Sequence, residues 1–247
     1  MLKDLPVHML WVSGELSRLA RLSLASFRTQ GYRVTLWSYD PDHLRAEADE
    51  VADAGTILPM PKEDVANMAY LTSLFRYRVL AERGGIWADM DVVALTADPK
   101  LPSRPLVASE KRRPFRHAEP TATHEALTQV TNCFMVNPTP NSGDLWHRAT
   151  DRVAALNPED RNWENVGPHM LSQLMLEDGQ GVEILPTDAV DPVAWWNVPA
   201  YFLEERDPPP SPFMHMYATI WARREVDAEA AFPPASLAGR LWKRFGL

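Results

Sequence analysis

The sequence predicts an α/β protein built on a parallel sheet, and three observations at the start of the chain support this. An apolar run over 7–12 is followed by a turn and by leucines at helical spacing that stop at Gly31. A second strand is expected over 33–39, which ends at the turn signal Asp40-Pro41. Strand, helix and strand in this order form a βαβ unit, whose ligands bind beyond the carboxyl ends of the strands.

The next elements follow from apolar spacing and from the positions of glycine and proline. A helix is expected over 65–83, ended by Gly84-Gly85. The strand that begins at Ile86 is expected to continue through Asp89-Met90-Asp91 to residue 95. Further elements expected along the chain are a basic loop at 103–117, a strand at 132–136, a helix at 144–156, a helix at 170–175 and a strand at 182–185.

Composition narrows the class of protein. A length of 247 residues, with no repeat and no flexible linker, predicts one domain over 1–247. The net charge of −8 argues against the broad basic face that nucleic-acid binding needs. Cys133 is the one cysteine, and the apolar run near the start is too short for a membrane span or a signal peptide. We therefore expect a cytoplasmic protein that binds no nucleic acid.

Asp89 and Asp91 are the strongest chemical signal. Side chains at i and i+2 of a strand lie on one face, so these two carboxylates converge while Met90 points into the core. Oxygen ligands at a strand end suit Mg²⁺ or Mn²⁺, which completes its coordination with substrate phosphates. An Asp-x-Asp pair alone also fits two exposed acids that bind nothing.

The residues around this pair resemble the glycosyltransferase family named for its DXD sugar-binding motif. That family includes yeast initiating mannosyltransferases and is related to the catalytic domain of large clostridial glucosylating toxins. The resemblance is carried by a helix arginine, a glycine pair, an aromatic residue and the two acids, here Arg76, Gly84-Gly85, Trp87, Asp89 and Asp91. It implies a GT-A type fold, in which a Rossmann-like mixed sheet is flanked by helices.

Further segments follow the family's order along the chain. The segment 8–14 is similar to a first strand whose tryptophan lies against the nucleotide base, and 132–135 to the strand that faces the transferred sugar. The segment 167–171 is similar to a Gly-Pro helix start, and 215–221 to an element that closes over the diphosphate. The implied donor-binding residues are Trp11, Val12, Ser73, Arg76, Asp89, Asn132, Thr219 and Trp221. The implied metal ligands are Asp89, Asp91 and His215, and the implied catalytic residues are Asp89, Asp91 and Arg76.

One position departs from the family pattern. An aspartate three residues before the helix arginine commonly binds hydroxyls of the donor sugar, and here that position is Ser73. A serine accepts fewer and weaker hydrogen bonds than a carboxylate, so the donor preference does not carry over. The departure also leaves open a chain that binds a nucleotide sugar or a glycan with little turnover.

The resemblance implies a metal-dependent glycosyltransferase of polysaccharide biosynthesis, with Mn²⁺ or Mg²⁺ as cofactor. It would move a hexose from a nucleotide diphosphate sugar to a hydroxyl of a glycan or lipid-linked acceptor, with retention of configuration. A catalytically weak nucleotide-sugar or glycan binding module is one alternative. Another is a haloacid dehalogenase-type phosphatase, because 89–93 also fits an Asp-x-Asp-x-Val strand. That class needs a downstream lysine and a late acidic pair, yet Lys100 and Lys111 are followed by no lysine before Lys243.

The segment 236–247 is basic in an acidic protein. Its apolar residues Leu237, Leu241, Trp242 and Phe245 share one helix face beside arginine and lysine. Two expectations follow. The segment is either a terminal helix docked on its own domain or a peripheral anchor on the inner face of the membrane, near a lipid-linked acceptor.

Overall fold

The computed structural model describes residues 2–60, 67–102, 104–111, 128–139 and 144–247. In this part of the chain, seven strands form the main sheet: Val7–Leu10 (β1), Val34–Ser38 (β2), Glu50–Asp53 (β3), Gly85–Ala88 (β4), Leu106–Lys111 (β6), Thr128–Asn137 (β7) and Glu183–Ile184 (β8). Their order in space is β3-β2-β1-β4-β7-β6-β8. Two more strands, Val92–Ala94 (β5) and Phe213–His215 (β9), form a separate antiparallel pair.

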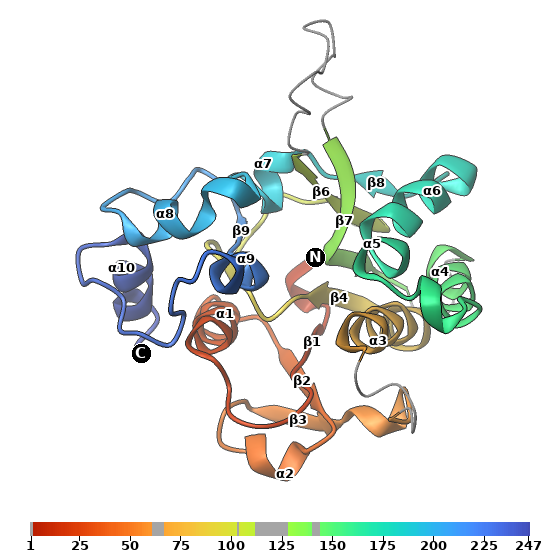
Figure 1. Ribbon diagram of the computed structural model, residues 1–247, viewed down its shortest axis with the longest axis horizontal. Helices are drawn as coiled ribbons and strands as arrows, with labels where there is room; N and C mark the ends of the chain where they lie inside the picture. Colours follow the sequence, from red (N-terminus) through yellow and green to blue (C-terminus); the bar gives the residue numbers. More distant parts are fainter. Residues whose placement is uncertain (1, 61–66, 103, 112–127, 140–143) are drawn as a thin grey trace, which may run out of the picture.

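The helices cover both faces of the main sheet. Their bounds are Arg18–Thr29 (α1), Pro41–Leu44 (α2), Met68–Arg83 (α3), Asp144–Ala154 (α4), Trp163–Val166 (α5), Pro168–Asp178 (α6), Thr187–Val190 (α7), Val198–Leu203 (α8), Ala218–Arg223 (α9) and Leu237–Arg244 (α10). One face packs against α3, α4 and α6, and the other against α1, α7 and the β5–β9 pair (Figure 1).

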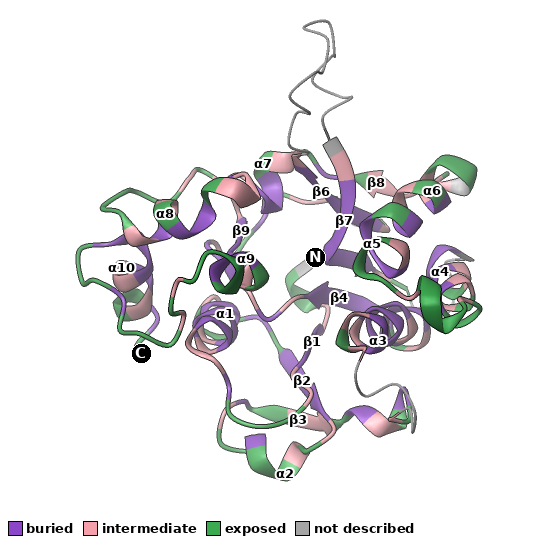
Figure 2. Cartoon of the chain, in the orientation of Figure 1, coloured by how far each residue is buried: buried purple, intermediate pink, exposed green. Residues whose placement is uncertain are grey.

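The main sheet is mixed in direction. β1 is parallel to β2 and β4, whereas β7 is antiparallel to both β4 and β6. The central strands are buried on both faces, and the exposed residues gather on the outer sides of the helices (Figure 2). The expected α/β fold, a mixed sheet flanked by helices, is therefore confirmed.

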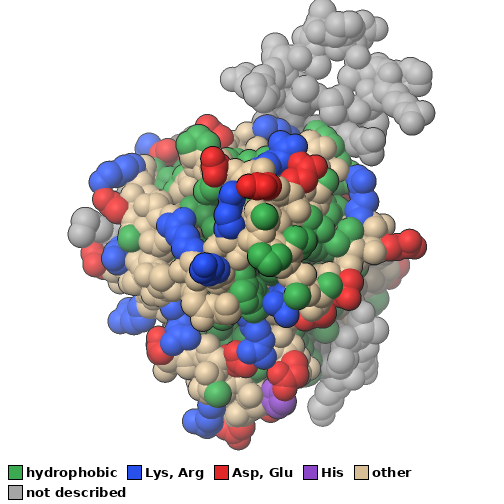
Figure 3. All heavy atoms as spheres, turned by 90° about the vertical axis from the view of Figure 1, so that its left-hand side faces the viewer, with side chains coloured by type: hydrophobic (Ala, Val, Ile, Leu, Met, Phe, Trp, Pro, Cys, Tyr) green, Lys and Arg blue, Asp and Glu red, His purple; other side chains and the backbone are tan. Residues whose placement is uncertain are grey.

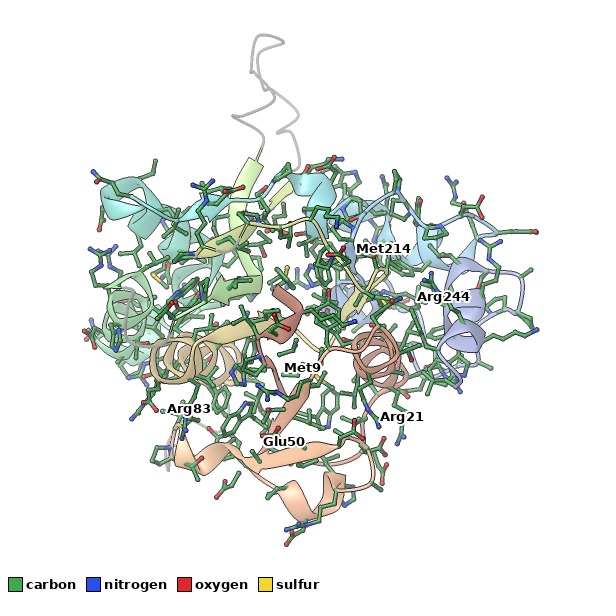
Figure 4. All side chains as sticks on the ribbon, turned by 180° about the vertical axis from the view of Figure 1, so that it is seen from behind. Met9, Arg21, Glu50, Arg83, Met214 and Arg244 are labelled. Carbon is green, nitrogen blue, oxygen red and sulfur yellow. The ribbon has the colours of Figure 1, made fainter. Side chains whose placement is uncertain are left out.

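A further core lies between the β5–β9 pair, α1 and the C-terminal helices. Met214 on β9 lies in this core, whereas Met9 on β1 lies in the core beneath the main sheet; both are fully buried (Figure 4). Leu237 and Leu241 of α10, and Phe245 directly after it, are all buried against this core. The 236–247 segment is thus a docked terminal helix, the first of its two expected states.

The outer surface beside α10 does not gather positive charge. The face that bears α8 and α10 mixes Lys and Arg with Asp and Glu rather than forming one basic patch (Figure 3). Arg244 of α10 donates a hydrogen bond to the backbone oxygen of Leu95 at 3.1 Å. Among the described helices, none combines the length and the apolar character that crossing a bilayer requires.

Several sequence expectations need correction. Residues 106–111 form strand β6 rather than part of a basic loop, because the run is buried beside β7 and pairs with it; residues 112–117 of that loop lie outside the described residues. β3 and β9 were not expected, since each is short and lacks an alternating pattern. The strand expected over 86–95 is interrupted at 89–91, where the chain turns and leaves the main sheet.

β4 begins at Gly85, a position that leaves no room for a side chain. Gly85 has a φ of +91°, and a Cβ there would lie 2.6 Å from the backbone oxygen of Pro6 and 3.0 Å from His8 Nε2. Replacing Gly85 by alanine should lower the free energy of unfolding by about 3 kcal/mol, from left-handed strain plus overpacking. Gly181 is the matched control, because its φ is +80° but nothing lies within 4 Å of the added Cβ.

Chemical denaturation of both variants checks this expectation. The Gly181→Ala variant should lose only about 1 kcal/mol, the cost of the backbone conformation alone. Equal losses in the two variants would show that the close approach of β4 to Pro6 contributes nothing.

Candidate active site

The turn after β4 brings the two acids of the motif to the edge of the sheet. The Asp89 N–H donates to the Cys133 backbone oxygen at 2.8 Å, and the Val92 N–H donates back to the Asp89 oxygen at 3.0 Å. The carboxylates therefore leave a tight turn at the carboxyl end of a parallel strand, where ligands bind in open α/β sheets. Their side chains are 25% and 16% exposed, for Asp89 and Asp91 respectively.

Asp89 is held from the α3 side. Nη1 of Arg76 lies 3.3 Å from its carboxylate, and the Trp87 indole N–H donates to Oδ1 at 2.7 Å. The Arg76 guanidinium also lies over the Trp87 ring, 5.3 Å from its centroid. Burial raises the pKa of Asp89 above its ordinary value, with the charge of Asp91 adding to the effect and Arg76 opposing it.

The contacts of Asp91 come from the C-terminal part of the chain. Its Oδ1 lies 3.3 Å from His215 Nε2, and its Oδ2 accepts the Ala218 N–H at 2.7 Å. Burial would raise the pKa of Asp91, but the charge and hydrogen bond of His215, with the Ala218 N–H, lower it below the ordinary value. One ligand atom from each of Asp89, Asp91 and His215 lies within 4.8 Å of the other two.

Asp89, Asp91 and Trp87 border a cavity of about 490 Å³. Its wall includes Trp11 and Val12 after β1, Arg76 on α3, the turn at 89–91, and Thr219 on α9. A larger hollow of about 600 Å³ lies between residues from 95–102, 183–189 and 208–212. Because the acids, Arg76 and Trp11 all line the first cavity, we regard that one as the candidate active site.

Three of the predicted donor-binding residues lie behind the wall of this cavity. Ser73 is buried, and its neighbour Thr72 lines the cavity instead. The Asn132 side chain donates to the Tyr77 hydroxyl at 3.0 Å. Trp221 is fully buried, and its indole N–H donates to the backbone oxygen of Met216 at 2.8 Å. Among the described residues, then, the cavity wall contains none of Ser73, Asn132 and Trp221.

Two of these buried residues still support the site. The backbone oxygen of Asn132 accepts a hydrogen bond from Arg76 Nη1 at 3.0 Å, which orients the guanidinium toward Asp89. Trp221 packs with Phe202 in the core beneath α9. Their contribution is to fix the neighbouring elements.

The sequence interpretation missed residues that surround His215. Asp191, at the end of α7, lies 2.9 Å from His215 Nδ1. The Tyr217 ring stacks on the imidazole with 3.8 Å between centroids, and its hydroxyl donates to Glu110 Oε2 at 3.0 Å. Asp191 precedes a proline and Glu110 lies in an apolar strand, and neither position has a local signal that marks it as functional.

His8 on β1 forms hydrogen bonds with Trp37 on β2 and with Gly84, which directly precedes β4. Its Nδ1 accepts the Trp37 indole N–H at 3.1 Å, and its Nε2 lies 3.1 Å from the Gly84 oxygen, to which it donates. This pair of bonds requires the neutral ring. Burial lowers the pKa of His8 to about 4.

The low pKa of His8 predicts acid-labile stability. A histidine with a folded-state pKa near 4 and an unfolded pKa near 6.5 stabilises the fold at neutral pH, and this contribution is lost as the pH falls from 6.5 to 4. Relative to the His8→Asn variant, the wild-type free energy of unfolding should fall by about 1 kcal/mol between pH 7 and pH 5.5. Urea unfolding of both proteins measures the difference, and parallel pH profiles would contradict it.

Comparison with known proteins gives structural likeness only. No protein-family model matches the chain, and no curated protein matches it. Among solved structures, it is similar to the PaToxG glycosyltransferase, with 13% identity over 70% of this chain and 68% of the other and a TM-score of 0.46. It is also similar to the galactosyltransferase LgtC, solved with donor and acceptor sugar analogues, with 11% identity over 97% and 99% and a TM-score of 0.36.

Proposed function

We propose that this chain is a metal-dependent glycosyltransferase with a GT-A type fold that takes a nucleotide diphosphate sugar as donor. The observation that supports it best is the group of two carboxylates and one imidazole, whose two carboxylates line a cavity of about 490 Å³. An arginine and a tryptophan, Arg76 and Trp11, line the same cavity. A cation site, an anchored guanidinium and an aromatic ring are the groups that a diphosphate, a sugar and a base require.

The donor set fits a hard divalent cation. Asp89 and Asp91 supply carboxylate oxygens and His215 an imidazole nitrogen, which suits Mn²⁺ or Mg²⁺ with water and phosphate completing the shell. When bound, such a cation neutralises the charge that develops on the departing diphosphate. The lowered pKa of Asp91 keeps that carboxylate ionised and ready to bind.

Each remaining residue of the site has a role set by its contacts. Arg76 orients Asp89, and its guanidinium lies where it can approach the donor. The Trp11 indole N–H is already bonded to the Gly14 oxygen, so the ring rather than the N–H contacts the base. Asp89 and Asp91 are both assigned to the cation. Retention then takes place by attack of the acceptor hydroxyl on the same side as the leaving diphosphate.

The two alternatives make different demands on the same residues. A phosphatase would need a lysine beside its nucleophile, yet among the described residues the side-chain partners of Asp89 are Arg76 and Trp87. A binding module would hold the nucleotide sugar with the same cation but leave it intact.

Calorimetric titration with UDP, GDP and CMP sugars, with Mn²⁺ and with EDTA, tests the proposal. The expected result is micromolar to millimolar binding of one nucleotide class that needs Mn²⁺. Binding of no nucleotide sugar under either condition would reject the proposal.

A further inference from the structure

Asp191 is a buried carboxylate with a partner on each oxygen. The residue is 1% exposed and ends helix α7. Its Oδ1 lies 2.9 Å from His215 Nδ1, and its Oδ2 lies 3.8 Å from the Cys133 sulfur. Burying a carboxylate is costly unless it is paired and hydrogen-bonded. We therefore ask what the buried position of Asp191 contributes to the site.

The His215 imidazole is held on three sides. Asp191 faces Nδ1, the Tyr217 ring stacks on one face at 3.8 Å, and Asp91 lies 3.3 Å from Nε2. Tyr217 is itself held in place, because its hydroxyl donates to the buried Glu110. The Nε2 edge of the ring therefore faces Asp91, one of the two acids that line the cavity.

This arrangement matches what a metal-binding histidine needs. When one ring nitrogen binds a cation, the other usually donates its N–H to a carboxylate, which fixes the tautomer and makes the ligating nitrogen a stronger donor. Asp191 occupies that position relative to the Nε2 edge that faces Asp91 and Asp89.

We infer that Asp191 is a positioning residue for the cation site: it holds the Nδ1 proton of His215 so that the Nε2 lone pair points to a divalent cation shared with Asp89 and Asp91. The inference rests on the proposed function only in assigning a cation to those three residues. Asp191 itself does not touch the cation or the donor.

A different occupant of the same cluster is the main competing explanation. Cys133, Asp191 and His215 also have ligand atoms within 4.8 Å of one another, as a thiolate site for zinc would require. In the structure the Cys133 thiol instead donates to Asp191 Oδ2 at 3.8 Å, while the other carboxylate oxygen faces His215 Nδ1 at 2.9 Å. The contacts favour the positioning role.

Manganese binding by the protein alone, measured by electron paramagnetic resonance without nucleotide, tests the inference. Asp191→Asn should weaken Mn²⁺ binding about 10- to 100-fold and reduce the nitrogen hyperfine coupling from His215. Cys133→Ser is the matched control. It retains a donor toward Asp191 Oδ2 and leaves the imidazole untouched, so its Mn²⁺ affinity should stay within about twofold of wild type.

A second measurement does not depend on the folding of any variant. In wild-type protein with ¹⁵N-labelled histidine, titration with Mg²⁺ should perturb Nε2 of His215, while Nδ1 remains protonated. Ligation through Nδ1 would overturn the inference and favour the Cys133 cluster. Unchanged Mn²⁺ affinity and coupling in a folded Asp191→Asn variant would overturn it while leaving the proposed function standing. Absence of Mn²⁺ binding by wild type without nucleotide would also overturn the inference, whereas the proposed function is tested separately by the titration with nucleotide sugars.

Discussion

Replacing Asp91 by asparagine should lower metal-dependent turnover of the donor at least about 100-fold. The change removes one negative charge from the cation site and keeps the side-chain volume. The amide oxygen can still accept the Ala218 N–H, so the backbone of the C-terminal element keeps its anchor. Initial rates at saturating nucleotide sugar, measured over a range of Mn²⁺ concentrations, give the effect on turnover and on metal affinity separately.

Asp98→Asn is the matched control for that experiment. Asp98 carries the same charge but is exposed and pairs with Lys100 away from the site. The Asp98→Asn variant should turn over the donor at the same rate as wild type. Wild-type rates for Asp91→Asn at limiting Mn²⁺ would rule out a metal-binding role for Asp91.

Arg76→Lys is expected to have the next largest effect, a loss of at least about tenfold in kcat/KM. The guanidinium bonds through Nε to the Thr72 oxygen at 3.2 Å and through Nη1 to the Asn132 oxygen at 3.0 Å, and it also reaches Asp89. An ammonium is a single point of charge and cannot reproduce this planar set of donors. Asp89 would then lose its fixed orientation at the cation site.

The control for this variant is on the same helix. Arg78 is half-exposed and pairs with Glu82 on the outer side of α3. Arg78→Lys should leave kcat/KM unchanged, since a surface pair of this kind contributes little. If the two variants lost activity equally, the effect would belong to the helix as a whole and not to the Arg76 contacts.

The sequence was sufficient where the determining interactions are local. The apolar spacing of α3, its end at Gly84 and the strand after it are readable from neighbours along the chain. The position of Asp89 and Asp91 at the edge of the sheet follows from the same run. The sequence predicts that the two carboxylates converge because they lie on one face of a strand. In the structure they converge because they lie in a turn, which is held by the hydrogen bond from the Asp89 N–H to the Cys133 backbone oxygen.

Contacts between distant segments could not be read in this way. His215 meets Asp91 because β9 pairs with β5, and that pairing joins residues more than 100 positions apart. Asp191 reaches the same imidazole from a one-turn helix between two prolines. The burial of Ser73 beside the lining residue Thr72 depends on how α3 is rotated against the sheet, which its helical period leaves undetermined.

Turnover of a nucleotide sugar is the activity that we propose for this chain, and consumption of the donor measures it. Purified protein is incubated with UDP, GDP and CMP sugars, Mn²⁺ and a mixed pool of saccharide acceptors, and released nucleotide and free or transferred sugar are quantified. We expect one donor class to be consumed with Mn²⁺, EDTA to stop the reaction, and Asp91→Asn to be at least about 100-fold slower than wild type. Mn²⁺-dependent binding of a nucleotide sugar with no release of nucleotide, under any of these conditions, would contradict this expectation and identify a binding module.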